Sequence, residues 1–121
     1  MKKLSDSEWL VMEVLWQHND LVLKDIVNSL KEKTKWTRNT VHTYLTRMEK
    51  KGLVKIDRQQ EPHHYSYLVS RDDYSQLERE ELLNKVYQGS LGDLITAFLK
   101  ESKITLEEKE KLNKLLDEME V

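Results

Sequence analysis

The stretch between Trp36 and Gly52 carries polar and basic side chains at the spacing of one helix face. These side chains are Asn39, His42, Thr43, Thr46, Arg47 and Lys50. None of them is acidic, whereas a helix face in water usually mixes both signs of charge. Asparagine can pair with adenine, and arginine with guanine, in the major groove of a DNA duplex. The face is therefore suited to contact with base edges.

The same stretch carries an apolar stripe on the opposite side. Its members, at the spacing of a buried helix face, are Val41, Tyr44, Leu45 and Met48. Thr37 is placed to cap this helix, and Gly52 stands where a helix end favours a left-handed residue. We therefore expect one amphipathic helix over residues 37–51.

Helix starts elsewhere are marked by a serine or threonine followed three residues later by an acidic residue. The pairs are Ser5 with Glu8, Ser70 with Asp73, Ser90 with Asp93, and Thr105 with Glu108. Together with the apolar periodicity, they predict helices over 5–18, 24–33, 37–51, 70–87, 90–101 and 105–119.

Two stretches have the pattern of strands instead. Residues 21–23 read as a short buried strand, and 53–58 and 64–69 alternate around a polar turn, which predicts a β-hairpin. Helix, short strand, two helices and a hairpin are the order of a winged helix. We expect a mainly α protein with a small β-hairpin, in which a winged helix-turn-helix DNA-binding domain (1–70) precedes a three-helix dimerisation region (71–121).

The net charge of −2 conceals an uneven distribution. Residues 1–70 hold 12 Lys and Arg against 9 Asp and Glu, whereas residues 71–121 hold 8 against 13. Within 35–58 the counts are 7 against 2. Binding of a polyanion depends on local charge, so this region can bind nucleic acid. From charge alone, a solvated basic patch on a helical protein is an equal alternative.

Other function classes lack their signatures. The chain has no cysteine, no apolar run long enough to span a membrane, no signal-peptide pattern, no nucleophile motif and no glycine-rich phosphate loop. Neighbouring His63 and His64 would point to opposite faces of a strand, so they do not form a metal site. We expect a cytoplasmic protein that is not an enzyme and needs no cofactor or metal.

The expected C-terminal helices carry more apolar surface than some 50 residues can bury alone. A second copy would cover it, and a two-fold dimer would place two reading helices on a palindromic site. The residues expected at the dimer interface are Leu83, Val86, Tyr87, Leu91, Leu94, Ile95, Phe98, Leu99, Leu112, Leu115 and Leu116. The alternative is a monomer in which these helices fold back on the N-terminal domain.

Three segments resemble the penicillinase-repressor family (BlaI/MecI), which includes the copper repressor CopY. They are residues 4–16, residues 36–53 and residues 81–91. The most specific part is Trp-Thr-x-x-Thr-Val-x-Thr from Trp36, followed by Arg-Met-x-Lys-Lys-Gly-Leu-Val from Arg47. The resemblance spans nearly the whole chain.

The resemblance implies a dimeric winged-helix repressor that binds a palindromic promoter operator. It places DNA reading at Thr37, Arg38, Asn39, Thr40, His42 and Thr43, and phosphate contacts at Arg47, Lys50 and Lys51. Arg58 and His63 complete the predicted DNA contacts. In the penicillinase branch the repressor is released when a β-lactam-sensing pathway cuts it, so a sensor protease is a further expected partner.

Several positions depart from the family pattern. The absence of cysteine excludes the metal switch of the copper branch within this sequence. Ala97-Phe98 stands where the penicillinase branch is cut at Asn-Phe, which argues against release by the same cleavage. Pro62 and His63 replace a glycine and a basic residue at the wing tip, and Leu23 replaces a helix-capping residue. The alternative function is a winged-helix protein-interaction module that does not bind DNA.

Overall fold

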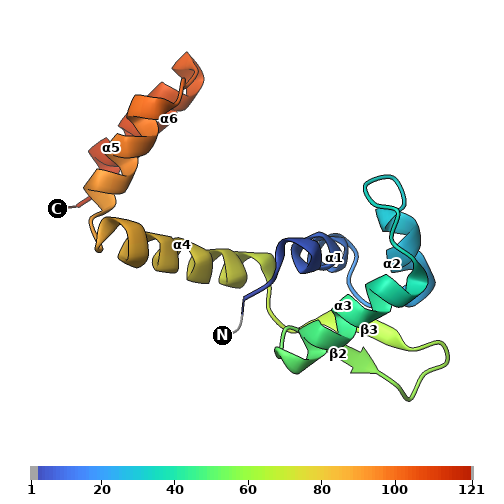
Figure 1. Cartoon of the computed structure of the whole chain (residues 1–121). Coiled ribbons are helices and arrows are strands. Elements are labelled where there is room, and N and C mark those ends of the chain that lie inside the picture. The colour runs from blue at the N-terminus through green and yellow to red at the C-terminus, as the bar shows by residue number, and fades with distance from the viewer. Residues whose placement is uncertain (1–2, 121) are drawn as a thin grey trace. The chain divides into compact units, whose positions relative to one another are not determined.

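The computed structural model describes residues 3–120 and divides the chain into two compact units, one ending at Ser75 and the other beginning at Gln76. The helices and strands are α1 (Asp6–Gln17), β1 (Leu21–Val22), α2 (Leu23–Leu30), α3 (Arg38–Lys50), β2 (Val54–Asp57), β3 (His64–Tyr67), α4 (Arg71–Tyr87), α5 (Leu91–Glu101) and α6 (Leu106–Glu118) (Figure 1). The first unit contains α1 to β3 and the first turn of α4. The second contains the rest of α4 with α5 and α6.

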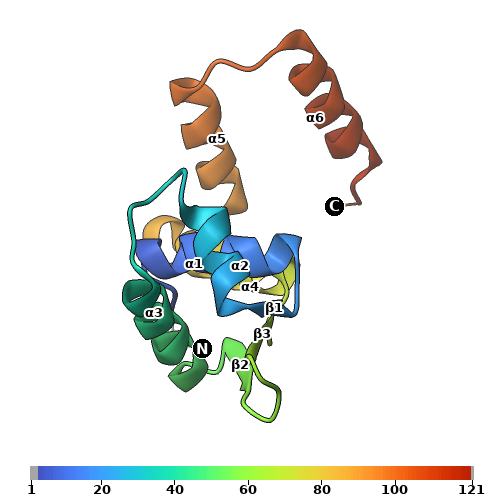
Figure 2. The same cartoon turned by 90° about the vertical axis from the view of Figure 1, so that its right-hand side faces the viewer.

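The first unit contains a three-stranded antiparallel sheet in the order β1-β3-β2. Tyr65 lies on the central strand, opposite Leu21 on one side and Ile56 on the other. The predicted hairpin and short strand are therefore confirmed, except that Leu23, predicted to end the strand, begins α2 instead. Figures 1 and 2 show the β2–β3 turn extending beyond the helices of this unit.

One hydrophobic core joins the three helices to the sheet. Its fully buried apolar side chains include Val11, Met12, Leu15, Ile26, Leu30, Val41, Leu45, Met48 and Leu53. Trp9 and Trp16 pack against this core and meet edge to face, with their ring centroids 5.4 Å apart. Both also lie against Tyr74 in the first turn of α4, so this turn is anchored to α1.

The helix starts follow the predicted capping pattern. Ser5 and Glu8 form a complete capping box, and the Thr37 hydroxyl accepts a hydrogen bond from the Thr40 N–H. The second helix differs from its prediction of 24–33. It starts after Val22, whose apolar side chain makes no capping bond, and ends at Leu30, after which the backbone bonds tighten to three-residue spacing.

A buried ion pair links α1 to the end of α3. The Glu8 carboxylate is buried and accepts hydrogen bonds from the Lys51 ammonium and, at 2.8 Å, from the Ser5 N–H. Burial opposes ionisation of Glu8, but Lys51 and Ser5 outweigh it, and the pKa of Glu8 lies below its usual value. Lys51 also donates to the Lys3 carbonyl at 2.8 Å. The ammonium of Lys51 therefore helps to hold the fold.

Glu8→Gln should lower the free energy of unfolding by about 1–3 kcal/mol at neutral pH, because Lys51 loses its charged partner. Since the folded pKa is lowered, the contribution of Glu8 is complete above about pH 4.5 and is lost as the pH falls through the folded value. Urea denaturation at neutral and acid pH measures both effects. Exposed Glu32→Gln is the matched control, and a Glu8→Gln chain as stable as wild type would contradict the assignment.

The second unit has no buried side chain among residues 76–120. Large apolar side chains instead remain exposed on all three of its helices. They are Leu77, Leu82, Val86, Leu91, Phe98, Leu99, Leu106, Leu112, Leu115 and Leu116. This unit therefore presents apolar faces that the single chain does not cover.

Candidate nucleic-acid interface

Helix α3 separates its apolar and polar residues as the sequence predicts. Val41, Leu45 and Met48 are fully buried in the core of the first unit. The predicted reading residues come together on the other side of the helix. Arg38, Asn39, His42, Thr43, Arg47 and Lys50 are all exposed there, and Thr40 is half-buried. An exposed helix face without an acidic side chain is thus part of the fold.

The threonines of α3 also hydrogen-bond to its backbone. The Thr43 hydroxyl donates to the Asn39 carbonyl at 2.9 Å, and Thr46 donates to the His42 carbonyl at 3.0 Å. A threonine held in this way presents its methyl group and a free oxygen lone pair outward. Thr37 has a structural function as well, since its oxygen caps the helix.

The predicted cationic contacts fall into two groups. No ion pair within residues 3–120 involves Arg47 or Lys50, so both charges face solvent. Arg58 instead forms a two-pronged contact with Glu49, at 2.6 and 2.9 Å, and this contact lowers the pKa of Glu49. Glu49 takes two of the five N–H donors of Arg58 and leaves the others for a phosphate. Among the lysines and arginines predicted to contact phosphate, Lys51 also has an internal partner, Glu8.

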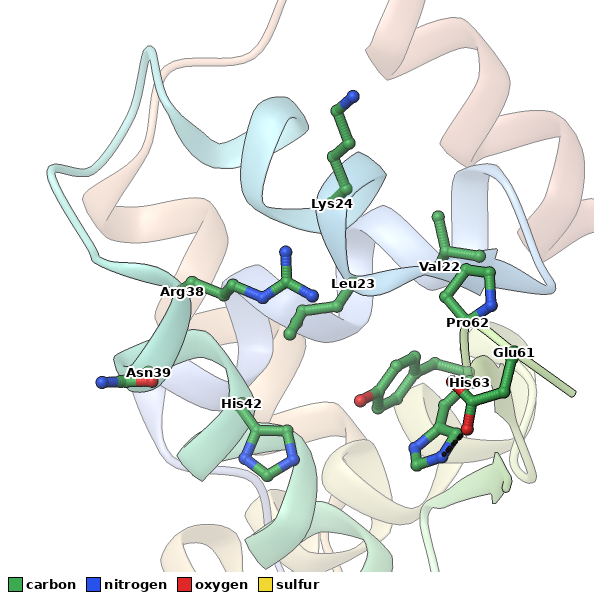
Figure 3. Close-up of a pocket in the computed structure, with 10 residues that line it drawn as sticks. Val22, Leu23, Lys24, Arg38, Asn39, His42, Glu61, Pro62 and His63 are labelled. Carbon is green, nitrogen blue, oxygen red and sulfur yellow. Dashed lines mark ion pairs between the residues drawn. The ribbon is translucent and has the colours of Figure 1, made fainter. Parts of the chain in front are cut away.

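A groove of about 630 Å³ lies beside the N-terminal half of this face. Its lining comes from the start of α2, from α3, from the β2–β3 turn and from the central strand: Val22, Leu23, Lys24, Arg38, Asn39, His42, Glu61, Pro62, His63 and Tyr65. In Figure 3, Arg38 extends across to Leu23, whereas Asn39 points away from the groove. His63 lies 3.5 Å from Glu61.

The groove adds three polar residues, Lys24, Glu61 and Tyr65, to those found from the sequence. Lys24 is basic and lies in the first turn of a predicted helix, which is a usable but weak signal. Tyr65 carries no signal of its own, because its side chain reaches the groove only through the pairing of β3 with β1. Arg38 and Asn39 both line the groove, although the Asn39 side chain is directed away from it, and Thr43 is not part of the lining.

Metal and membrane sites are not found in the part of the chain that the structure describes. No group of three or more His, Cys, Asp or Glu side chains between residues 3 and 120 is arranged to hold a metal ion. None of the described helices is both long and apolar enough to cross a membrane.

Three helices, a small antiparallel sheet and an exposed basic helix beside a hairpin define a winged-helix DNA-binding domain. Residues 4–118 match the family model described as the penicillinase repressor. The chain belongs to the penicillinase repressor family, as the sequence motifs predict. This is a family of DNA-binding transcriptional repressors and not of enzymes.

Relatives match over nearly the full length. The penicillinase repressor of Bacillus licheniformis is 29% identical over 121 residues, which cover 98% of this chain and 94% of that protein. The methicillin resistance regulatory protein MecI of Mammaliicoccus sciuri is 26% identical over 95% of this chain and 94% of its own length. The Bacillus licheniformis BlaI monomer, solved in complex with the blaP half-operator, is 27% identical with a TM-score of 0.52, covering 60% of this chain and 89% of that one.

Proposed function

We propose that this DNA-binding repressor acts as a homodimer on a palindromic promoter operator, where it blocks transcription in the cytoplasm. The observation that carries the proposal is the exposed face of α3, on which polar and basic side chains stand without an acidic one. Acceptors and donors on such a helix match the base edges of a major groove.

On the DNA side, we assign two functions to the residues of this interface. Base reading is assigned to Asn39, His42 and Thr43, with Thr37 and Thr40 at the start of the helix. Arg47, Lys50 and the wing residues Arg58 and His63 contact phosphates, which fix the register without reading sequence. Lys51, at the end of α3, donates two N–H groups within the fold and has one left for a phosphate. The BlaI structure with a half-operator supports this mode, because that protein has the same fold.

On the protein side, we assign the exposed apolar faces of α4, α5 and α6 to dimerisation. Phe98, at 49% exposure, and Leu115 and Leu116, each at 56%, are large apolar side chains that need a cover. A two-fold interface uses the same surface on both copies, so a second chain presents a matching apolar face. We therefore propose that the residues predicted for the dimer interface, from Leu83 to Leu116, form that interface.

A nuclease-protection experiment on the DNA upstream of the chain's own gene tests the proposal. We expect one protected site with two inverted half-sites about one helical turn apart, or a multiple of it. Inserting half a turn between them should abolish strong binding, because the second half-site then faces away, whereas inserting a full turn should be less harmful. Binding that ignores both insertions would contradict a rigid dimer. Absence of any protected site would favour the protein-interaction module.

We further propose that a sensor protease is a partner of this protein and cleaves it within the second unit. Ala97 and Phe98, which occupy the family's cleavage position, lie within α5, and Phe98 is exposed. Cleavage there would remove part of the proposed interface and so release the operator. The alanine in place of asparagine requires that such a protease accept a small apolar residue before the cut.

A further inference from the structure

The groove beside α3 contains a polar group that the fold leaves unpaired. Tyr65 is 2% exposed and lines the groove. Its hydroxyl makes no hydrogen bond with any residue in the range 3–120. The hydroxyl oxygen is not sealed from solvent, because Glu8 Oε2 is the fully buried side-chain polar atom that lacks a partner among residues 3–120. A solvent-accessible hydroxyl without a protein partner is open to a hydrogen-bond partner in the groove. A hydroxyl that lines a groove can obtain that partner from a ligand.

The Tyr65 hydroxyl is a donor rather than an oxyanion. Burial raises the pKa of Tyr65 above its ordinary value, against the opposing effect of the nearby Arg58 and Arg38 charges. The group therefore stays protonated at neutral pH. Its favoured partner is a strong acceptor such as a phosphate oxygen.

The surroundings of this hydroxyl favour an anion. Arg38 crosses the groove with its guanidinium, and no ion pair within the described residues neutralises it (Figure 3). Helix α2 starts at the groove, and its N-cap residue Val22 offers no side-chain acceptor to the first N–H groups. Glu61 is the acidic side chain of the lining, and it lies beside His63.

We propose that the groove is a seat for one phosphate group, held by the Tyr65 hydroxyl, the Arg38 guanidinium and the uncapped start of α2. The phosphate comes either from the DNA backbone or from a free phosphate-bearing molecule that would compete with DNA. The first source rests on the proposed function. In both cases Tyr65 is a binding residue and Arg38 is a phosphate contact rather than a base reader.

Tyr65→Phe tests the seat, because it removes one oxygen atom and keeps the ring in the sheet. We expect the affinity for the operator and for a random duplex to fall alike, by about tenfold. The salt dependence of binding should not change, since the phenol carries no charge. The thermal stability should be close to that of wild type, because the hydroxyl makes no hydrogen bond within the described residues. Tyr67→Phe, two residues along the same strand and outside the groove lining, is the matched control.

A second measurement separates the two sources. Inorganic phosphate is added to the full-length chain, and backbone amide shifts are followed by NMR at Leu23, Lys24 and Arg38. Shifts in wild type that vanish in Tyr65→Phe show that the seat accepts free phosphate. No shifts, together with weaker DNA binding by Tyr65→Phe, show that the seat is filled by the DNA backbone.

The proposal is overturned when Tyr65→Phe binds DNA like wild type and phosphate shifts none of these amides. It is also overturned when the variant loses affinity only in proportion to lost stability. If wild type binds no DNA at all, the proposed function fails, and the phosphate titration alone then decides the seat.

Discussion

A chain carrying Phe98→Glu should be monomeric and should bind the full operator about 10²–10⁴-fold more weakly than wild type. The reason is that Phe98 is a large apolar side chain of α5 that one chain leaves half exposed. A glutamate there would have to lose its water inside the proposed interface, which is costly for an unpaired charge. A monomer keeps its contacts with one half-site but loses the gain from binding two linked half-sites.

Analytical ultracentrifugation measures the mass, and a mobility-shift titration measures the affinity. Thr96→Glu is the matched control, because it adds the same charge to an exposed, polar position of the same helix. It should remain dimeric. The affinity of Phe98→Glu for an isolated half-site should equal that of wild type. A Phe98→Glu dimer, or a monomer that binds the full operator as tightly as wild type, would contradict the assignment of the interface.

Arg47→Ala should weaken DNA binding by about 10- to 100-fold, for operator and random duplex alike. Arg47 lies on the exposed face of α3 and has no acidic partner within the described residues, so its whole charge is available to a phosphate. Each lost phosphate contact also reduces counterion release, so the slope of log affinity against log salt should fall by about one.

The control for this variant is Arg79→Ala, which removes an exposed arginine from α4 in the second unit. It should change neither the affinity nor the slope appreciably. Arg58→Ala should have a smaller effect than Arg47→Ala, because Glu49 already offsets the Arg58 charge. Equal effects of the Arg47 and Arg79 substitutions would indicate that only net charge matters and would contradict a specific contact by Arg47.

The recognition helix could be predicted because its information is local. The apolar and polar residues of 37–51 alternate within one helix, so periodicity alone separates the buried face from the exposed one. The same holds for the helix starts at Ser5, Ser90 and Thr105, where the capping residue and its partner are three positions apart. These features come directly from the amino-acid order.

The pairings between distant elements could not be predicted. Lys51 and Arg58 have the positive charge expected of DNA contacts. Their acidic partners, Glu8 and Glu49, lie on other elements of the fold than they do. Tyr65 likewise occupies an apolar position in the alternating pattern of its strand, which predicts a core residue. Only the position of β1 beside β3 brings it to the groove. Sequence periodicity shows which face a residue occupies, but it does not show what lies opposite.

The central claim is that α3 reads bases through its exposed face. Its most direct test measures the affinities of wild type and Asn39→Ala for the operator and for every single base-pair substitution within it. We expect one base pair, an A·T, at which wild type prefers the natural base by about 1–3 kcal/mol and Asn39→Ala has no preference, while other positions keep theirs. Asn28→Ala, at an exposed position of α2, should keep every preference. If Asn39→Ala keeps the wild-type preference at every base pair, the claim is contradicted.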